Sequence, residues 1–477
     1  MIEQRKFYIN GSWVDPIAGS DCEVIDPSIE EPVAVISLGG QADTDAGVAA
    51  AKAALPAWRA LPVDERIGYV RRILEVYTER QHDMAKAVSL EMGAPIDFSL
   101  AEQVDSGDWH IRGFLEAVKN FEWEHRLNDK PGTRIIKDPI GVVGMITPWN
   151  WPMNQVTLKT IPAMMAGCTM VLKPSEIAPL SSLLFAEIVD AAGVPPGVFN
   201  LVNGDGLGVG TQLSVHPDVD MVSFTGSTRA GIAISKAAAD TLKRVSLELG
   251  GKGANIVFAD ADAEAVHRGA RQCFENTGQS CNSPTRMLVE RSRYEQAVAQ
   301  ATEVARDTRV ASASESGGHI GPLVSEAQFN KVQALIQTGI DEGARLVAGG
   351  IGRPDGLNRG YFVRPTVFAD VTPDMTIMRE EIFGPVLSIM PFDAPDEALE
   401  IANDTVYGLT NYVQSSDPET LKRFARDLHS GMVQMNGKSR GQGAPFGGVG
   451  QSGNGREGGV WGIEEFVEIK SVGGWPD

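Results

Sequence analysis

Between residues 41 and 92 the apolar positions recur at helical spacing. Residues 41–60, QADTDAGVAAAKAALPAWRA, form an alanine-rich stretch with Asp43 near its start, where a carboxylate stabilises a helix N-terminus. Residues 62–92 continue with an amphipathic pattern that predicts one or two helices ending at Gly93. This part of the chain is therefore predicted to be helical.

After about residue 140 the pattern changes to short, β-branched apolar runs with helical stretches between them, such as residues 180–193. The runs are GVVGMI (141–146), CTMVL (168–172), VFNLV (198–202) and DMVSF (220–224). Strands spaced about 25 to 30 residues apart, with helices between them, predict βαβ units and a parallel sheet. Such a sheet binds its ligands at the carboxyl ends of its strands.

A second α/β region begins near KGANIVFADAD (252–262) and contains a long helical stretch at about 291–311. Residues 119–138 and the C-terminal FVEIKSVGGW (466–475) resemble strands that belong to neither sheet. Apolar strands without a place in a sheet are candidates for edge pairing between subunits. The sequence thus predicts two α/β regions and a small β element for oligomerisation.

Composition narrows the class of protein. The 477 residues are 43% hydrophobic and 22% charged, as in globular proteins, and the net charge of −20 opposes binding to nucleic acid or an anionic membrane. The most apolar stretch, residues 161–172, is shorter than the about 18 residues of a membrane span, and the N-terminus has no apolar signal segment. The four cysteines form no CxxC motif, which favours a reducing, cytoplasmic setting.

One cysteine stands out because its neighbours are polar. Cys281 lies in GQSCNSPTR (278–286), a small, glycine-containing turn, whereas Cys168 lies in an apolar run and Cys273 in a helical stretch. A structural thiol packs like a small apolar group, while a reactive thiol needs an approach path and dipoles that favour the thiolate. These neighbours alone leave the reactive and the structural interpretation equally open.

Two loops resemble nucleotide-binding turns, although no G-x-G-x-x-G is present. In SFTGSTRAG (223–231) a strand leads into a Gly-Ser-Thr turn that opens a helix, a geometry that favours a phosphate but also caps ordinary helices. VLKPSE (171–176) ends a strand with Lys173 and Glu176, which suit ribose hydroxyls or form a solvated pair. GDGLGVG (204–210) alone predicts a plain loop.

Together the motifs resemble those of the aldehyde dehydrogenase superfamily. They cover nearly the whole chain in the family's order, which makes the set specific although each motif alone is weak. The matching stretches are TPWNWP (147–152), VLKPSE, SFTGSTRAG, LELGGK (247–252), GQSC, EEIFGPV (380–386) and PFGGVGQSGNGREGG (445–459).

The resemblance implies a role for each matched position. Cys281 is the implied nucleophile, Asn150 the amide donor to the oxyanion beside the backbone N–H of Cys281, and Glu248 the base that activates water. The residues implied to contact or border the cofactor are Ile146, Thr147, Pro148, Trp149, Lys173, Glu176, Gly206, Gly210, Phe224, Thr225, Gly226, Ser227, Leu249, Glu381 and Phe383. Trp151, Gln155 and Asn282 are expected to line the substrate tunnel, and no metal is implied.

The implied fold is α/β, with a Rossmann-like parallel-sheet cofactor domain, a second α/β catalytic domain and a small β oligomerisation element. The expected boundaries are 1–118 and 139–249 for the NAD-binding domain, 250–448 for the catalytic domain, and 119–138 with 460–477 for the oligomerisation strands. The implied assembly is a homodimer or homotetramer.

The implied reaction converts an aldehyde and water to the carboxylic acid with NAD⁺ as the oxidant. A carboxylate at position 176 would repel a 2′-phosphate, which favours NAD but leaves NADP open. Lys438 and Arg440, in a polar segment expected to face the substrate, suggest an acidic semialdehyde or are simply solvated. His110 and His125 show no metal spacing and are expected to be structural or surface residues.

Three alternatives remain at this point. Relatives that pass the acyl group to coenzyme A typically lack the Glu248 base, and a catalytically silent relative would have replaced Cys281, Asn150 or Glu248. A cysteine hydrolase without nicotinamide would need a histidine partner, and no histidine lies in the matched motifs. One departure from the family pattern is Gly450, where a lysine is common; the sequence offers no mechanistic account of it.

Overall fold

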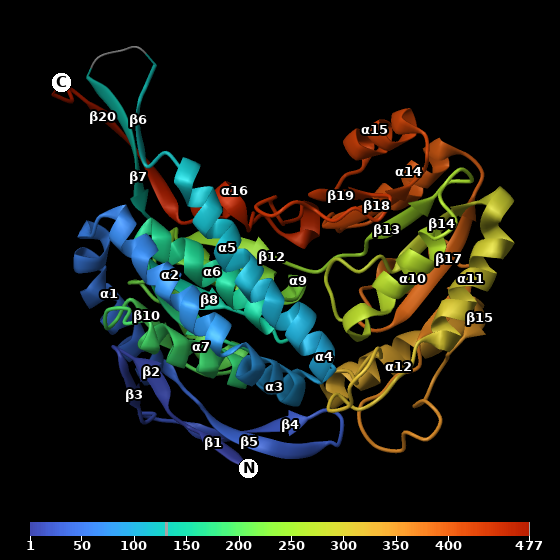
Figure 1. Cartoon of the computed structure of the whole chain (residues 1–477), viewed down its shortest axis with the longest axis horizontal. Helices are drawn as coiled ribbons and strands as arrows, with labels where there is room; N and C mark the ends of the chain where they lie inside the picture. The colour runs from blue at the N-terminus through green and yellow to red at the C-terminus, as the bar shows by residue number, and fades with distance from the viewer. Residues whose placement is uncertain (129–131, 477) are drawn as a thin grey trace.

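The structure is a computed structural model that describes residues 1–128 and 132–476. Two seven-stranded sheets and two three-stranded sheets organise these residues. Each large sheet carries helices on both faces, and the two α/β bodies lie side by side (Figure 1). The predicted fold class, α/β with two parallel-sheet regions, is confirmed.

The first large sheet has the order β12-β11-β8-β9-β10-β2-β3. Its five strands from β12 to β10 are parallel, whereas β2 and β3 extend the edge antiparallel. The strands are β2 (Phe7–Ile9), β3 (Ser12–Val14), β8 (Val142–Ile146), β9 (Thr169–Lys173), β10 (Phe199–Leu201), β11 (Met221–Thr225) and β12 (Arg244–Glu248).

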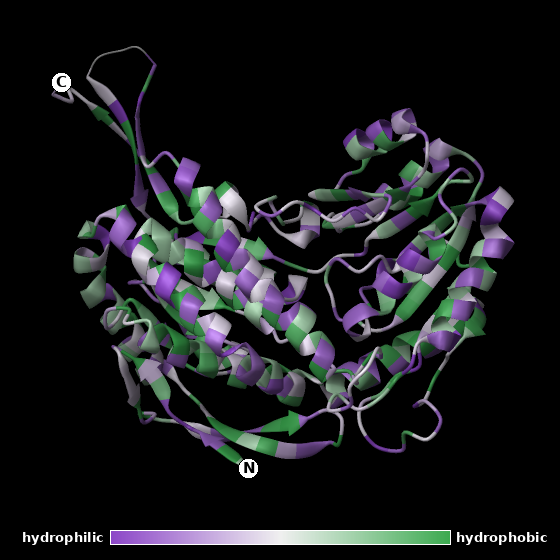
Figure 2. Ribbon diagram, viewed as in Figure 1, coloured by the Kyte–Doolittle hydropathy of each residue, from purple (hydrophilic) through white to green (hydrophobic). Residues whose placement is uncertain are grey.

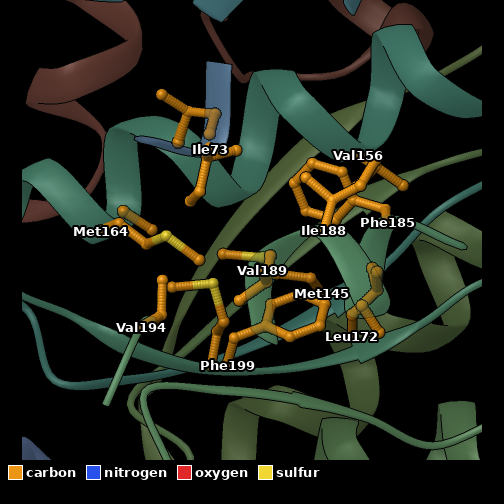
Figure 3. Packing of buried hydrophobic residues seen from close by; sticks show 14 of the residues in the cluster. Ile73, Met145, Val156, Met164, Leu172, Phe185, Ile188, Val189, Val194 and Phe199 are labelled. Atoms are coloured by element: carbon orange, nitrogen blue, oxygen red, sulfur yellow. The ribbon is translucent and has the colours of Figure 1, made fainter. Parts of the chain in front are cut away.

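Alternating side chains of this sheet enter two different cores, because successive residues of a strand point to opposite faces. Val143 and Met145 of β8 pack with the helices of one face, and Val142 and Ile146 pack toward the other. Figure 3 shows the first of these cores, with Met145 and Leu172 of the sheet below side chains of the covering helices. Burial on both faces explains why these strands are uninterrupted apolar runs in the sequence.

The helices of the first body connect and cover its strands. They are α1 (Gln41–Ala60), α2 (Val63–Glu79), α3 (Gln81–Met92), α4 (Ile96–Phe98), α5 (Asp105–Ala117), α6 (Pro152–Ala166), α7 (Leu180–Ala191), α8 (Thr211–Val215) and α9 (Thr228–Ala238). The helix predicted at 41–60 is confirmed. The stretch 62–92 forms two helices, and the second of them ends at Gly93, which has φ 81°.

The second large sheet has the order β15-β16-β17-β14-β13-β18-β19 and is parallel except for β15. Its strands are β13 (Ala254–Val257), β14 (Arg286–Glu290), β15 (Arg345–Ala348), β16 (Thr366–Ala369), β17 (Val386–Phe392), β18 (Thr410–Gln414) and β19 (Met432–Met435). Its helices are α10 (Ala265–Phe274), α11 (Tyr294–Asp307), α12 (Glu326–Asp341), α13 (Thr376–Arg379), α14 (Pro395–Asn403) and α15 (Pro418–Asp427).

The two small sheets lie outside these bodies. One joins β1 (Ile2–Gln4), β5 (Glu31–Leu38) and β4 (Ser20–Asp26). The other joins β6 (Glu124–Arg126), β7 (Thr133–Pro139) and β20 (Val467–Gly473), and it projects from the molecule near α16 (Gly459–Glu464) (Figure 1). The separate strands predicted from 119–138 and 466–475 thus exist, although residues 129–131 and 477 lie outside the described residues.

One local prediction is wrong. Residues Gly206–Gly210, expected to be a plain loop, form a helical turn that leads into α8. The Asp205 carboxylate accepts the Gly208 N–H and initiates this turn. Elsewhere hydrophobic residues concentrate on the strands and on the helix faces turned toward them, while polar residues cover the outside (Figure 2).

The buried side chain of Arg286 joins two segments of the second body by hydrogen bonds. Its side chain is 2% exposed, and its guanidinium donates to the carbonyls of Lys252, Ile401 and Ala402 at 2.9 to 3.0 Å. The last two carbonyls lie at the C-terminal end of α14, where helical carbonyls lack partners within the helix. Arg286 therefore joins α14 to the segment that precedes β13.

We predict that Arg286→Met lowers the free energy of unfolding by about 3 kcal/mol, because three buried carbonyls lose a charged donor. Arg286→Lys should recover only part of this loss, since an ammonium cannot reproduce the planar fork. Arg291→Met removes an exposed pair with Asp393 and should cost at most about 1 kcal/mol. Urea unfolding of the three variants measures the order, and equal midpoints would contradict the role of Arg286.

Candidate active site

A cavity of about 400 Å³ lies where the two bodies meet. Loops after β8, β11 and β12 line it from one side, and the turn before β14, α12 and later loops line it from the other. Of the residues predicted for catalysis, cofactor or substrate, this lining contains Pro148, Trp149, Asn150, Trp151, Gln155, Thr225, Gly226, Ser227, Leu249, Cys281, Asn282, Glu381 and Phe383. The structure therefore brings most of the predicted residues together.

The remaining predicted residues do not line this cavity. Ile146, Thr147 and Phe224 are buried in or beside strands of the first sheet, and Gly206 and Gly210 bound the helical turn before α8. Lys173 and Glu176 pair with each other, with Lys173 Nζ 3.0 Å from Glu176 Oε2. Glu248 is buried at the end of β12.

Cys281 follows a turn with unusual backbone geometry. Asn276, Thr277 and Gly278 have φ values of 51°, 57° and 71°, so three consecutive residues occupy the left-handed region. This region is costly for a β-branched residue such as Thr277. A Cβ at position 278 would lie 2.1 Å from the Gly384 carbonyl oxygen, so the chain passes there too closely for any side chain. The turn thus holds Cys281 at the cavity against a local energetic cost.

Hydrogen bonds from the first body fix this turn. The Asn150 carbonyl accepts the side-chain amides of Gln103 and Asn276, each at 3.0 Å. The Asn150 side chain in turn donates to the Gln279 carbonyl at 2.9 Å. The amide of Asn150 and the backbone leading to Cys281 are therefore locked to each other across the boundary between the two bodies.

The Cys281 thiol is half-buried at the cavity wall. Burial raises the pKa of this thiol, and the nearby Glu381 and Glu248 carboxyls raise it further. The resting group is therefore the neutral thiol. Nucleophilic attack then requires that the proton leave as the sulfur bonds to an electrophile, since the thiolate is the reactive form.

Glu248 is 2% exposed, and neither of its carboxylate oxygens has a hydrogen-bond partner among the described residues. Burial raises its pKa well above the ordinary value, and the neighbouring Glu457 raises it further. Glycine backbone lies close to one of its oxygens: a Cβ on Gly447 or Gly455 would lie 2.7 or 2.9 Å from Glu248 Oε1. A buried, unpaired carboxyl of raised pKa is the form expected of a general base.

Glu381 and Phe383 shape the cavity wall formed by the second body. Glu381 Oε1 accepts the Gly251 N–H at 2.9 Å, and a Cβ on Gly250 would lie 2.4 Å from Glu381 Oε2. Phe383 has φ 61°, and its ring meets Trp149 edge-on with centroids 5.5 Å apart. The glycines after Glu248 thus allow the carboxylate of Glu381 to approach the backbone closely.

The first body offers groups suited to a dinucleotide. Ser227 caps α9, with its Oγ accepting the Ala230 N–H at 3.3 Å, which leaves the helix N-terminus facing the cavity beside Gly226. The Thr225 hydroxyl is buried without a hydrogen-bond partner among the described residues. Lys173 ends β9 and Glu176 follows it; in the sheet, β8 lies between β9 and the strand β11 that precedes Gly226. This donor and acceptor set fits phosphate and ribose groups.

Several lining residues were not predicted. Asn154, Leu158 and Phe446 lie on the side of Trp151, and Gln328 and Lys331 of α12 donate to backbone carbonyls of the 381–383 segment. The start of α6 carries three of the lining residues: Trp151 and the unpredicted Asn154 and Leu158. Their spacing of i, i+3 and i+7 places them on one face of a helix, so the sequence could have indicated that Asn154 and Leu158 accompany Trp151. The two α12 residues belong to none of the matched motifs, so no sequence pattern indicated that they would lie at the cavity.

The structure places three further positions that the sequence left open. His110 is buried and pairs with Asn154 at 2.9 Å, which agrees with the expected structural position, and it also lines the cavity. Arg440 lines the cavity but Lys438 is exposed outside it. Gly450 has φ 60°, and a Cβ there would lie 2.9 Å from the Val406 carbonyl oxygen, which explains glycine at this position.

A protein-family model for the aldehyde dehydrogenase family matches residues 13–472. The chain belongs to this family. The family resemblance found in the motifs is thereby confirmed, as is the prediction of an aldehyde-oxidising enzyme class. Within the described residues no helix is both long and apolar enough to cross a membrane.

Individual aldehyde dehydrogenases are similar over their full length. The chain is 50% identical to 3-succinoylsemialdehyde-pyridine dehydrogenase of a Pseudomonas species, covering 100% of this chain and 99% of the relative. The crystal structure of an aldehyde dehydrogenase from Bartonella henselae has a TM-score of 0.99 and 59% identity, with complete coverage of both chains. A mutant of aldehyde dehydrogenase C from Pseudomonas syringae, solved with NAD⁺ and octanal, has a TM-score of 0.97 and 48% identity, over 99% and 97% of the chains.

Lys252, at the end of the LELGGK motif, is a buried cation of this aldehyde dehydrogenase. It is 2% exposed, and its Nζ has no hydrogen-bond partner among the described residues. Burial, with a smaller contribution from Arg286, lowers its pKa to about 7. The unfolded chain, where lysine titrates near pH 10.4, therefore binds more protons than the folded chain between about pH 7 and 10.4.

We predict that Lys252→Met stabilises the protein at pH 7 by on the order of 4 kcal/mol and that this gain disappears as the pH rises toward 10.4. The sign follows because the wild-type free energy of unfolding rises with pH over this range. The exposed Lys86 of α3 provides a control, Lys86→Met, which should change stability by less than about 0.5 kcal/mol. Urea unfolding at pH 7, 8 and 9 tests this, and a pH-independent difference would contradict it.

Proposed function

We propose that the protein oxidises an aldehyde to its carboxylic acid with NAD⁺ and water, through a covalent intermediate on Cys281. The observation that carries this proposal is the arrangement of three groups at the cavity boundary. The Cys281 thiol and the Asn150 amide both line the cavity, and the unpaired Glu248 carboxyl lies close enough to raise the Cys281 pKa.

Cys281 begins the proposed reaction by bonding to the aldehyde carbon through its sulfur, while the thiol proton passes to water in the cavity. This step is needed because a trigonal aldehyde has no electron pair that can expel a hydride, whereas the tetrahedral thiohemiacetal anion does. The Asn150 side-chain amide and the Cys281 backbone N–H are the donors for the oxygen that gains charge. Such a donor typically contributes about 3 to 4 kcal/mol to transition-state stabilisation.

Glu248 is proposed to complete the reaction by deprotonating a water that hydrolyses the thioester on Cys281. Water is a poor nucleophile at neutral pH, so a carboxylate of raised pKa is required. Because Glu248 does not line the cavity, its side chain must rotate toward Cys281 for this step. The missing side chains at Gly447 and Gly455 keep the space around its carboxyl free for that rotation.

NAD⁺, when bound, supplies the hydride acceptor. We propose that Gly226 and Ser227 at the start of α9 bind its pyrophosphate, that Lys173 and Glu176 bind the adenosine ribose, and that Glu381 and Phe383 orient the nicotinamide end. Relatives of known structure from Pseudomonas syringae, Bacillus cereus and Mycobacterium tuberculosis were solved with NAD⁺, which supports this cofactor. The Glu176 carboxylate would repel the 2′-phosphate of NADP, so NAD is the proposed preference.

The alternatives do not match the site equally well. Transfer to coenzyme A leaves the buried Glu248 carboxyl without a role, and a silent relative leaves unexplained the strained turn that presents Cys281. A cysteine hydrolase would use a histidine partner, but the His110 that lines the cavity is bonded to Asn154 and not to Cys281.

For the assembly, we propose a homodimer or homotetramer in the cytoplasm. The β6–β7–β20 sheet projects from the molecule with open edges, which is the geometry of strands that pair between subunits. The proposed division assigns 1–118 and 139–249 to the NAD-binding domain, 250–448 to the catalytic domain, and 119–138 with 460–477 to oligomerisation.

Cys281→Ala is predicted to reduce NADH formation from aldehydes to below a few per cent of the wild-type rate, because no sulfur remains to form the tetrahedral intermediate. Cys22→Ala is the matched control: Cys22 is likewise half-buried but belongs to β4, and its substitution should leave turnover within twofold. Absorbance at 340 nm and mass spectrometry after iodoacetamide labelling give the readouts. Substantial turnover by the Cys281 variant would reject the nucleophile.

Glu248→Gln is predicted to retain a pre-steady-state burst of NADH and then stall, because acylation of Cys281 does not need the base but thioester hydrolysis does. In the wild type, steady-state turnover should rise with pH as the Glu248 carboxyl, whose pKa is raised, loses its proton. Stopped-flow measurements from pH 6 to 9 test both statements. Unchanged steady-state turnover in the variant would exclude the base role.

A further inference from the structure

The part of the cavity near α6 is more polar than a pocket for a simple hydrocarbon chain requires. Three described lining residues carry a full charge: Lys331, Glu381 and Arg440. Lys331 donates to the Glu381 carbonyl at 2.8 Å, so these two belong to the wall that is proposed to orient the nicotinamide. Of these three charged residues, Arg440 is therefore the one that lines the part of the cavity proposed for the substrate.

The Arg440 guanidinium is only partly satisfied by the protein. One nitrogen, Nη1, donates to the carbonyls of Ala444 and Pro445 at 3.4 and 3.2 Å, and the group lies 4.9 Å from the centre of the Phe446 ring. Among the described residues no carboxylate lies within ion-pair distance of it, and its Nε and Nη2 make no hydrogen bond.

This arrangement is unusual for a side chain that is mostly removed from water. Of the arginines in the structure, many of the exposed ones pair with a carboxylate, as Arg291 does with Asp393. Burial lowers the Arg440 pKa, and the nearby Tyr412, Cys281 and Glu248 offset this effect only in part. A partly buried cation without a carboxylate partner has lost part of its hydration, so a ligand that supplies an anion gains free energy by pairing with it.

The other described residues that line the cavity near α6 carry no charge. His110 faces the same region, and burial together with the Arg440 charge lowers the His110 pKa to about 3, so this imidazole is neutral. Asn154 is bonded to His110, and the Gln155 side-chain oxygen is buried without a hydrogen-bond partner. These neutral polar groups line the same cavity as the guanidinium, and none of them is an anion that would pair with it.

We propose that Arg440 binds a carboxylate on the substrate, so that the protein's preferred aldehydes carry a carboxylate at the end opposite the aldehyde carbon. This inference rests on the proposed function of the same cavity and names its substrate class. The planar guanidinium matches a carboxylate through two parallel N–H···O bonds, and its free Nε and Nη2 form one such edge. With the sulfur of Cys281 at one end of the substrate and Arg440 at the other, the aldehyde carbon is held at the thiol.

The test compares aldehydes of similar length that differ in their far end. The probes are 4-oxobutanoate and 5-oxopentanoate, which carry a carboxylate; pentanal, which carries a methyl group; and 4-oxopentanal, which carries a neutral ketone. For the wild type we expect kcat/KM to be at least tenfold higher for a carboxylate probe than for pentanal.

Arg440→Gln should lower kcat/KM for the carboxylate probes by about 10- to 100-fold, mainly through a higher KM, because a charged hydrogen-bond pair is lost. For pentanal the same variant should stay within threefold of the wild type. Lys438→Gln is the matched control, since it removes a nearby cation that the structure leaves exposed outside the cavity, and it should leave all four probes within twofold.

Each alternative outcome has a distinct meaning. If the wild type oxidises pentanal but shows no preference for carboxylates, the substrate class is wrong and the aldehyde-oxidising function stands. If 4-oxopentanal matches the carboxylate probes, Arg440 binds a neutral carbonyl and the anionic class is overturned. If Arg440→Gln impairs pentanal equally, the residue only braces the 440–446 loop. If no probe is oxidised with NAD⁺ or NADP⁺, the proposed function itself fails.

Discussion

The hydrogen bonds between Asn150 and the turn before Cys281 are the constraint on which the site depends. Asn150 belongs to the loop after β8, and Cys281 to the loop before β14, so the proposed nucleophile and the proposed oxyanion donor come from loops of different sheets. The Asn150 carbonyl receives two side-chain amides, and its own amide binds the Gln279 carbonyl. Because both partners are buried, the relative position of thiol and amide is fixed before any ligand binds.

That constraint also explains why a strained turn persists. Two residues other than glycine in the left-handed region cost roughly 1 to 3 kcal/mol each. Asn276 is fastened by its bond to Asn150, and the Thr277 hydroxyl donates to the Gly321 carbonyl at 3.1 Å. These contacts come from outside the turn, so the surrounding structure determines a conformation that the local sequence would not adopt.

The sequence predicted the parts of this site that are contiguous motifs. The order of strands and helices followed from hydrophobic periodicity, and the matched motifs identified Cys281, Asn150 and Glu248, the first two of which meet at the cavity. Their common signal is local: a strand end followed by glycine or a polar turn. Periodicity could not predict the helical turn at Gly206–Gly210, because a single capping bond from Asp205 decides it.

The sequence could not predict the cavity residues that come together only through tertiary contacts. His110 in α5 and Arg440 in a late loop are 330 positions apart, and only folding puts both at one cavity with Asn154 of α6. Nothing within NGKSRGQGA distinguishes Arg440 from Lys438: both are cations in a polar loop, yet one faces the cavity and the other solvent. The proposed catalytic residues belong to contiguous motifs, whereas the far end of the cavity is built from side chains scattered along the chain. The residues proposed to select the substrate can therefore be recognised only in the three-dimensional structure.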